Sequence, residues 1–110
     1  MHEFSVSAVA AVLDFAVLKP NQTSTDIDSA AALCGQLSIG CLCVQPIDVC
    51  RAARLLHDQR TVIASVVGFP HGANTTAIKV PEARVAIKEG ARELDMVLAL
   101  QALRDGDHPT

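Results

Sequence analysis

The stretch that decides the fold is residues 61–97, TVIASVVGFPHGANTTAIKVPEARVAIKEGARELDMV. Residues 62–67 are apolar and rich in β-branched side chains, which favour a buried strand. A glycine-rich loop follows at residues 68–74, and a helical segment ends near Gly90. The next apolar run, a second strand, contains Asp95. A carboxylate in a buried parallel strand is costly unless it is paired or used, so Asp95 marks a candidate site.

The same alternation of strand and helix continues on the N-terminal side. The predicted strands are residues 12–18, 41–44, 62–67 and 93–99. Residues 5–11 and 46–56 are predicted helices, and Pro46 stands in the first turn of the second. This order predicts a single α/β domain with parallel strands in the 110-residue chain. Two architectures fit, an open doubly wound sheet and part of a (β/α)₈ barrel.

The helix after the first strand has clear signals at its start and end. Thr23 can cap it, and Asp26 can complete a capping box. Gly40 is the predicted end. Its predicted apolar face consists of Ile27, Ala31, Cys34 and Leu37.

The helix of the opening stretch is less regular. Asn74 or Thr75 can cap it, but Pro81 would cost about 3 kcal/mol in a helix interior, so we expect the helix to restart near Pro81. We expect Lys79 and Lys88 to face outward. The predicted apolar part is Ala83, Val85, Ala86 and Ile87.

Composition excludes several classes of function. The net charge of −3 argues against nucleic-acid binding through a basic patch, and no apolar run is long enough to span a membrane. The N-terminal residues lack the basic start of a signal peptide, so we predict a folded cytoplasmic protein. No Cys-x-x-Cys pair occurs, which favours buried thiols over a zinc site or disulfides. The cysteines are Cys34, Cys41, Cys43 and Cys50.

Several motifs, in this order and spacing, carry a resemblance to a known family. They are VLDFAVLKPNQT (12–23), CLCVQP (41–46), VVGFPHGANTTAIKV (66–80), EA (82–83), AIKEGARELDMV (86–97) and ALRDGD (102–107). Together they resemble the first half of deoxyribose-phosphate aldolase. The resemblance implies that residues 1–110 are an incomplete TIM-barrel domain. It also implies a class I aldolase, a lyase of deoxyribonucleotide catabolism that uses neither metal nor cofactor. That enzyme cleaves 2-deoxy-D-ribose 5-phosphate to D-glyceraldehyde 3-phosphate and acetaldehyde through a lysine Schiff base.

The resemblance also implies roles for three residues. Asp95 matches the aspartate that handles protons, and Asp14 and Cys43 match residues of the substrate pocket. From the residues alone, Asp95 could instead pair with Arg92 or be solvated, and Cys43 could be plain core. His71 has no partner nearby in sequence and is interpreted as shaping its loop.

The sequence departs from the family's pattern in ways that bear on activity. The family's two lysines lie on its sixth and seventh strands, whereas the lysines here are Lys19, Lys79 and Lys88. Phe15 and Ala16 stand where the family usually has His and Thr.

We therefore expect a fragment that is inactive alone and is completed by a complementary C-terminal half or by a second copy. A non-catalytic half-barrel binding module is the alternative. A doubly wound domain with a phosphate ligand at residues 68–74 is a third interpretation, although that loop lacks a dinucleotide or Walker pattern.

Overall fold

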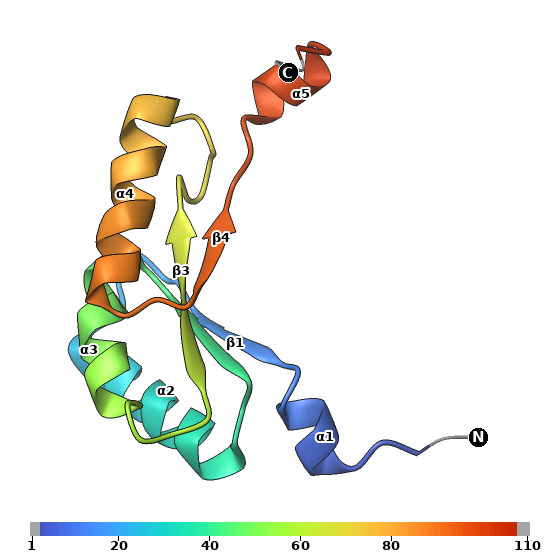
Figure 1. Ribbon diagram of the computed structural model, residues 1–110, viewed down its shortest axis with the longest axis vertical. Helices are drawn as coiled ribbons and strands as arrows, with labels where there is room; N and C mark the ends of the chain where they lie inside the picture. The colour runs from blue at the N-terminus through green and yellow to red at the C-terminus, as the bar shows by residue number, and fades with distance from the viewer. Residues whose placement is uncertain (1–2, 108–110) are drawn as a thin grey trace.

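The computed structural model describes residues 3–107, and its elements follow the predicted order (Figure 1). They are α1 (Val6–Ala10), β1 (Asp14–Val17), α2 (Ser24–Leu37), β2 (Cys41–Val44), a 3₁₀ helix η1 (Pro46–Asp48), α3 (Val49–Leu55), β3 (Val62–Val67), α4 (Thr76–Glu89), β4 (Glu93–Met96) and α5 (Leu100–Arg104). The predicted strands at both ends of the sheet, residues 12–18 and 93–99, are longer than the observed β1 and β4.

The sheet has four parallel strands in the order β1-β2-β3-β4. Helices α2, α3 and α4 all lie on one side of it (Figure 1). A doubly wound sheet reverses its strand order and carries helices on both faces, whereas a (β/α)₈ barrel adds strands in sequence with the helices outside. The fold is therefore α/β, with the architecture of half a barrel.

The core lies between the sheet and these helices. Leu42 and Val44 of β2 are fully buried in it, and Ile27 of α2 and Val49 of α3 pack on the same side. The Thr61 hydroxyl, at the start of β3, donates to the Ile39 carbonyl at 2.6 Å. The core thus joins the first three β/α units into one body.

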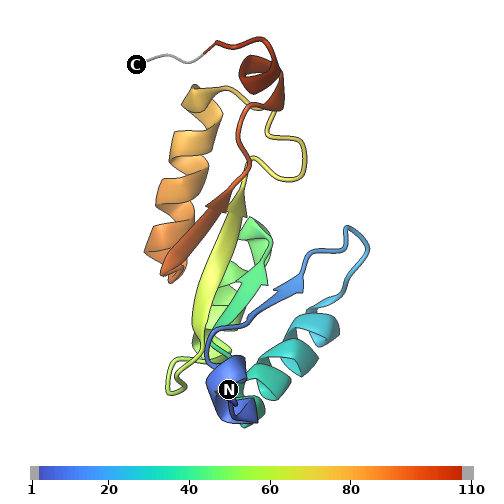
Figure 2. The ribbon, with the colours of Figure 1, turned by 90° about the vertical axis from the view of Figure 1, so that its right-hand side faces the viewer.

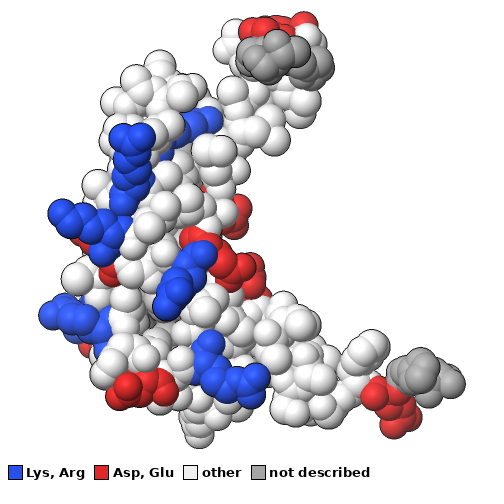
Figure 3. Space-filling view, in the orientation of Figure 1, with Lys and Arg blue, Asp and Glu red and all other residues white. Residues whose placement is uncertain are grey.

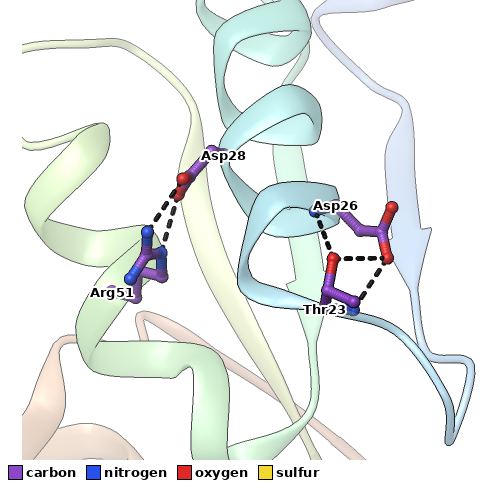
Figure 4. A network of polar contacts seen from close by, with 4 residues as sticks. All are labelled: Thr23, Asp26, Asp28 and Arg51. Atoms are coloured by element: carbon purple, nitrogen blue, oxygen red, sulfur yellow. Dashed lines mark hydrogen bonds and ion pairs between the residues drawn. The ribbon is translucent and has the colours of Figure 1, made fainter.

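The predicted start of α2 is confirmed, but its predicted end is wrong. Thr23 and Asp26 form the capping box: the Thr23 N–H donates to the Asp26 carboxylate at 2.7 Å, and Thr23 Oγ1 accepts from the Asp26 N–H at 3.4 Å (Figure 4). The helix ends at Ser38, which has a φ of 52°, and not at Gly40. Gly40 instead passes so close to the Ala11 carbonyl that a Cβ there would lie 2.2 Å from its oxygen.

An ion pair joins the outer surfaces of α2 and α3. Arg51 donates two hydrogen bonds to Asp28, at 2.7 and 2.8 Å (Figure 4). The hydrogen bonds from Arg51 hold the pKa of the Asp28 carboxyl below its usual value. Both side chains are partly exposed, so this pair contributes little to stability and chiefly sets the contact between two helices.

The expected interruption at Pro81 is wrong, because α4 is continuous from Thr76 to Glu89. Pro81 lies in its second turn, on an exposed side, where the Ala77 carbonyl that loses its N–H partner is near water. The predicted apolar part of α4 is confirmed for two of its four residues. Ala86 is buried and Ala83 is half-buried, but Val85 and Ile87 are more than half exposed.

The described chain has an open, crescent-like outline with α1 and α5 at its opposite ends (Figures 1 and 2). Its radius of gyration is 15.6 Å, against about 13 Å for a compact domain of this length. Both edges of the sheet are unpaired within residues 3–107. Exposed apolar side chains lie beside these edges, namely Phe4, Val6 and Leu13 near β1, and Ile87, Met96 and Leu98 near β4. Each edge is therefore suited to receive a further strand.

Over residues 3–107, none of the helices has the length and hydropathy needed to cross a membrane.

Candidate active site

Alternation along the strands brings the predicted site residues to the inner face of the sheet, opposite the helices. Leu42 and Val44 of β2 point into the helix-covered core, so Cys41 and Cys43 point the other way and form a second cluster with Ala64 and Val66 of β3. Asp14 pairs in register with Cys41, and Asp95 pairs with Val66. Asp14, Cys43 and Asp95 therefore share one face, although they are up to 81 residues apart in sequence.

A third carboxylate, Glu93, joins this inner face. The oxygen and sulfur atoms of Asp14, Cys41 and Glu93 lie within 4.8 Å of one another. Figure 3 shows carboxylates in the hollow of the crescent, whereas most of the Lys and Arg atoms visible in that view lie over the helices. The sequence motifs do not single out Glu93, but its position two residues before Asp95 in the same strand is the signal that places both on one face.

The carboxylates change the chemistry of the two inner thiols. Burial, and after it the negative charges of Asp95, Asp14 and Glu93 in that order, together raise the pKa of Cys43 to about 11. Burial likewise raises the pKa of Cys41, with added contributions from Glu93 and Asp14. A metal ion would require the Cys41 thiolate. The raised pKa opposes its formation in the metal-free chain, and a group of exposed carboxylates beside one thiol does not by itself define a metal site.

Asp95 itself is exposed on the open inner face. The ion pairs found among residues 3–107 are Arg51–Asp28 and His57–Asp58, so the alternative pairing of Asp95 with Arg92 is not formed. Its carboxylate is accessible to a molecule that enters the hollow of the sheet.

Hydrogen bonds from backbone N–H groups hold the loops at the carboxyl ends of the strands. The Gly68 N–H donates to Glu82 of α4 at 2.7 Å, and the Val97 N–H donates to the Val67 carbonyl at 2.9 Å. Gly72 has a φ of 67°, and a Cβ there would lie 2.1 Å from the Leu98 carbonyl oxygen, so the loop needs glycine at this point. The 68–74 loop therefore packs directly on the chain that leaves β4.

A hollow of about 400 Å³ lies at the carboxyl ends of β1, β2 and β3. Leu18, Gln45, Val66 and Phe69 are among the residues that line it. Gln45 donates to the Leu18 and Lys19 carbonyls, each at 3.2 Å, and so ties the loop after β1 to the end of β2. Barrel enzymes build their sites at this end of the strands. His71 is exposed in the neighbouring loop, consistent with a role in the turn.

The expected outward orientation of Lys79 is wrong. Lys79 is 9% exposed, and its ammonium donates to the Val97 carbonyl at 2.8 Å beside the outer face of β4. Lys88 is exposed on α4 as predicted, and Lys19 is exposed in the loop after β1. Neither Lys79 nor Lys88 reaches the inner face where Asp95 lies.

Four parallel strands in sequential order, helices outside and polar side chains inside define the first half of a (β/α)₈ barrel protein. No family model matches the chain. It is 41% identical to the deoxyribose-phosphate aldolase of Staphylococcus haemolyticus over 97 residues, which are 88% of this chain and 44% of that protein. It is 38% identical to the enzyme of the same name from Caldanaerobacter subterraneus over 106 residues, 96% of this chain and 46% of the relative.

Solved structures give the same result. A putative deoxyribose-phosphate aldolase from Coccidioides immitis superposes with a TM-score of 0.90 at 31% identity, over 96% of this chain and 42% of that one. The aldolase of Aeropyrum pernix, described as tetrameric, gives 0.83 at 27% identity, over 88% and 42%. Over nearly its whole length the chain is similar to deoxyribose-phosphate aldolases. It spans somewhat less than half the length of the relatives it matches, which is consistent with their N-terminal half.

Proposed function

We propose that this chain supplies the first four β/α units of an aldolase that cleaves 2-deoxy-D-ribose 5-phosphate to D-glyceraldehyde 3-phosphate and acetaldehyde. The observation that carries the proposal is the position of Asp95. It lies on the inner face of β4 without an ion-pair partner among the described residues, and Asp14 and Cys43 share that face. In this proposal Asp95 handles protons, and Asp14 and Cys43 line the substrate pocket.

The reaction needs an amine that the inner face of this half does not provide. In a class I aldolase, a lysine amine attacks the substrate carbonyl and water leaves, and the resulting iminium accepts the electron pair of the broken carbon–carbon bond. Asp95, acting with water, would carry the protons of these steps. We assign the amine to the second half of the barrel, where it would face Asp95.

Charge supports this division between the two halves. Asp14, Glu93 and Asp95 place three carboxylates on one face, and their charge already raises the pKa of the Cys43 thiol. Cations from the facing half would offset this negative potential, and the carboxylates would in turn favour binding of protonated amines.

The proposal also covers the partners, cofactors and location of the chain. Residues 1–110 act as an incomplete barrel domain, completed by a complementary C-terminal half or, in a homo-oligomer, by a second copy. Apart from the phosphorylated sugar, it needs no metal or cofactor and binds neither nucleic acid nor membrane. Its predicted cytoplasmic location rests on the sequence alone.

A second candidate is a non-catalytic half-barrel module that binds a partner. Ala16 favours it, because it lies in register with Cys43 on β2, at a position where the family usually has a polar threonine. The inner face therefore lacks one polar group beside the candidate pocket.

A chimera tests the proposal. This chain replaces the matching half of the Staphylococcus haemolyticus relative, and release of acetaldehyde from 2-deoxyribose 5-phosphate is followed by a coupled assay. We expect cleavage, and we expect Asp95→Asn to lower kcat at least about a hundredfold, the usual range for loss of an acid–base group. Asp58→Asn, an exposed carboxylate on the helix side, is the matched control and should stay within about twofold of the unmodified chimera.

Two results would count against the proposal. A folded chimera that cleaves nothing rejects the aldolase function and leaves the binding module. An Asp95→Asn chimera with full kcat rejects the role of Asp95. With this chain alone, borohydride reduction in the presence of acetaldehyde should leave no adduct, and a stable adduct on Lys19 would reassign the amine to this half.

A further inference from the structure

Lys79 is the one charged residue that is buried among residues 3–107. It stands in a mostly apolar groove of about 560 Å³ between α4 and β4, lined by residues such as Val67, Val80 and Met96. An apolar side chain would suit this groove better, because burying an ammonium is unfavourable unless it gains a partner. The partner here is the Val97 carbonyl, at 2.8 Å from Nζ.

Val97 is therefore held on both sides. Its N–H donates to the Val67 carbonyl at the end of β3, at 2.9 Å, and its carbonyl accepts from Lys79 of α4. Asp95 precedes Val97 by two residues, and Met96 between them ends β4. Any movement of the Val97 peptide displaces the strand end that carries the Asp95 carboxylate.

Glu82, one helical turn after Lys79, makes the matching contact with β3. Its Oε1 accepts from the Gly68 N–H at 2.7 Å, directly after the strand ends at Val67. Gly68 also lies against the stem of Lys79, since a Cβ on Gly68 would come within 2.8 Å of Lys79 Cε. The Lys79 ammonium binds the Val97 carbonyl after β4, and the Glu82 carboxylate binds the Gly68 N–H after β3. These two charged hydrogen bonds hold the ends of both strands to α4.

We propose that Lys79 and Glu82 form a strand-end clamp, with Lys79 as a positioning residue that orients Asp95 for its proton transfers. The clamp consists of Lys79 on the Val97 carbonyl and Glu82 on the Gly68 N–H. Its catalytic consequence rests on the function proposed above for Asp95, but its structural part does not.

The first test is hydrogen exchange on this chain, measured by NMR. Lys79→Met keeps the length and apolar packing of the side chain but removes the donor. We expect exchange of the Val97 amide to become at least about tenfold faster in Lys79→Met, and to stay within about twofold of the unmodified chain in Lys88→Met, an exposed lysine of the same helix. If Lys79→Met fails to fold, Lys79→Gln, which keeps a polar group too short to reach Val97, replaces it.

The second test is kinetic and uses the chimera. In Lys79→Met, kcat should fall at least about tenfold with KM within about twofold, while borohydride still traps the acetaldehyde adduct at the unmodified level. A purely structural loss would lower trapping and kcat together with the folded fraction.

The two tests separate the possible failures. Unchanged Val97 exchange in Lys79→Met overturns the clamp, and changed exchange with unchanged kcat overturns its positioning role. If the unmodified chimera cleaves nothing, the aldolase function has failed, and Val97 exchange alone then upholds or overturns the clamp.

Discussion

Replacing Asp95 with asparagine should make the Cys43 thiol more reactive. With a pKa of about 11, the Cys43 thiol is about 1% ionised at pH 9, whereas a thiol with a pKa of 9.0 is about half ionised. If the reagent reached both thiols equally well, Cys43 should therefore be alkylated about fiftyfold more slowly. Burial is the largest cause of this pKa and the charge of Asp95 is the next. Asp95→Asn removes that negative charge, so the pKa must fall. We expect a decrease of about half a pH unit and about a threefold higher alkylation rate at pH 9.

The assay is a pulse of iodoacetamide at each pH between about 8 and 12, followed by peptide mass spectrometry. Exposed Cys50 in the same molecule is the reference thiol, and Asp58→Asn is the control for loss of a carboxylate elsewhere. The midpoint of the pH profile is the decisive quantity, because restricted access lowers the rate without moving the midpoint. A Cys43 midpoint that is the same in Asp95→Asn and in the unmodified chain would refute the placement of the two side chains on one face.

Three further predictions concern stability, measured as the urea-unfolding free energy. The pKa of Cys43 is higher in the folded chain than its ordinary value of 9.0, so its contribution to the unfolding free energy is complete below about pH 9 and is lost as the pH rises through about 11. The difference of about two pH units corresponds to about 3 kcal/mol. Cys43→Ala should therefore flatten the decline of the unfolding free energy over this pH range. Thr61→Val should cost about 1–3 kcal/mol, since it leaves buried carbonyls without their hydroxyl donor, and a neutral result would mean that water or another donor replaces it. Gly72→Ala should cost at least about 2 kcal/mol, because its Cβ would meet the Leu98 carbonyl, whereas Gly106→Ala, with a similar φ and open space, should cost about 1 kcal/mol; equal losses would contradict the close contact.

Local signals predicted most of the elements correctly. The capping pair Thr23 and Asp26 predicted the start of α2, and Gly90, with a φ of 120°, ends α4 as expected. These signals depend on residues within one helical turn, so they can be read from a short stretch. Pro81 is the exception, because its cost depends on whether the freed Ala77 carbonyl is near water, and that depends on which side of α4 faces the sheet.

The alternation of side chains along the strands predicted part of the candidate site. The shared face of Asp14, Cys43 and Asp95 follows from two-residue periodicity once the strands are known to be parallel and in sequential order. Spacing alone did not separate a barrel from a doubly wound sheet. The motif resemblance favoured the barrel, and the observed strand order confirms it.

The sequence by itself determined the alternation of strand and helix, the helix start at Thr23 and the resemblance to deoxyribose-phosphate aldolase, because each of these rests on neighbouring residues or on ordered motifs. Only the tertiary structure decided which strands pair, which side of α4 is buried, and that Lys79 binds the Val97 carbonyl. The physical reason is that a lysine on a helix is driven to solvent by its own hydration. Only the packing of α4 against the end of β4, 18 residues away in sequence, supplies the carbonyl that holds it inside. The same is true of Asp95: its inner-face position follows from its strand, but only the assembled sheet shows that it has no ion-pair partner among residues 3–107.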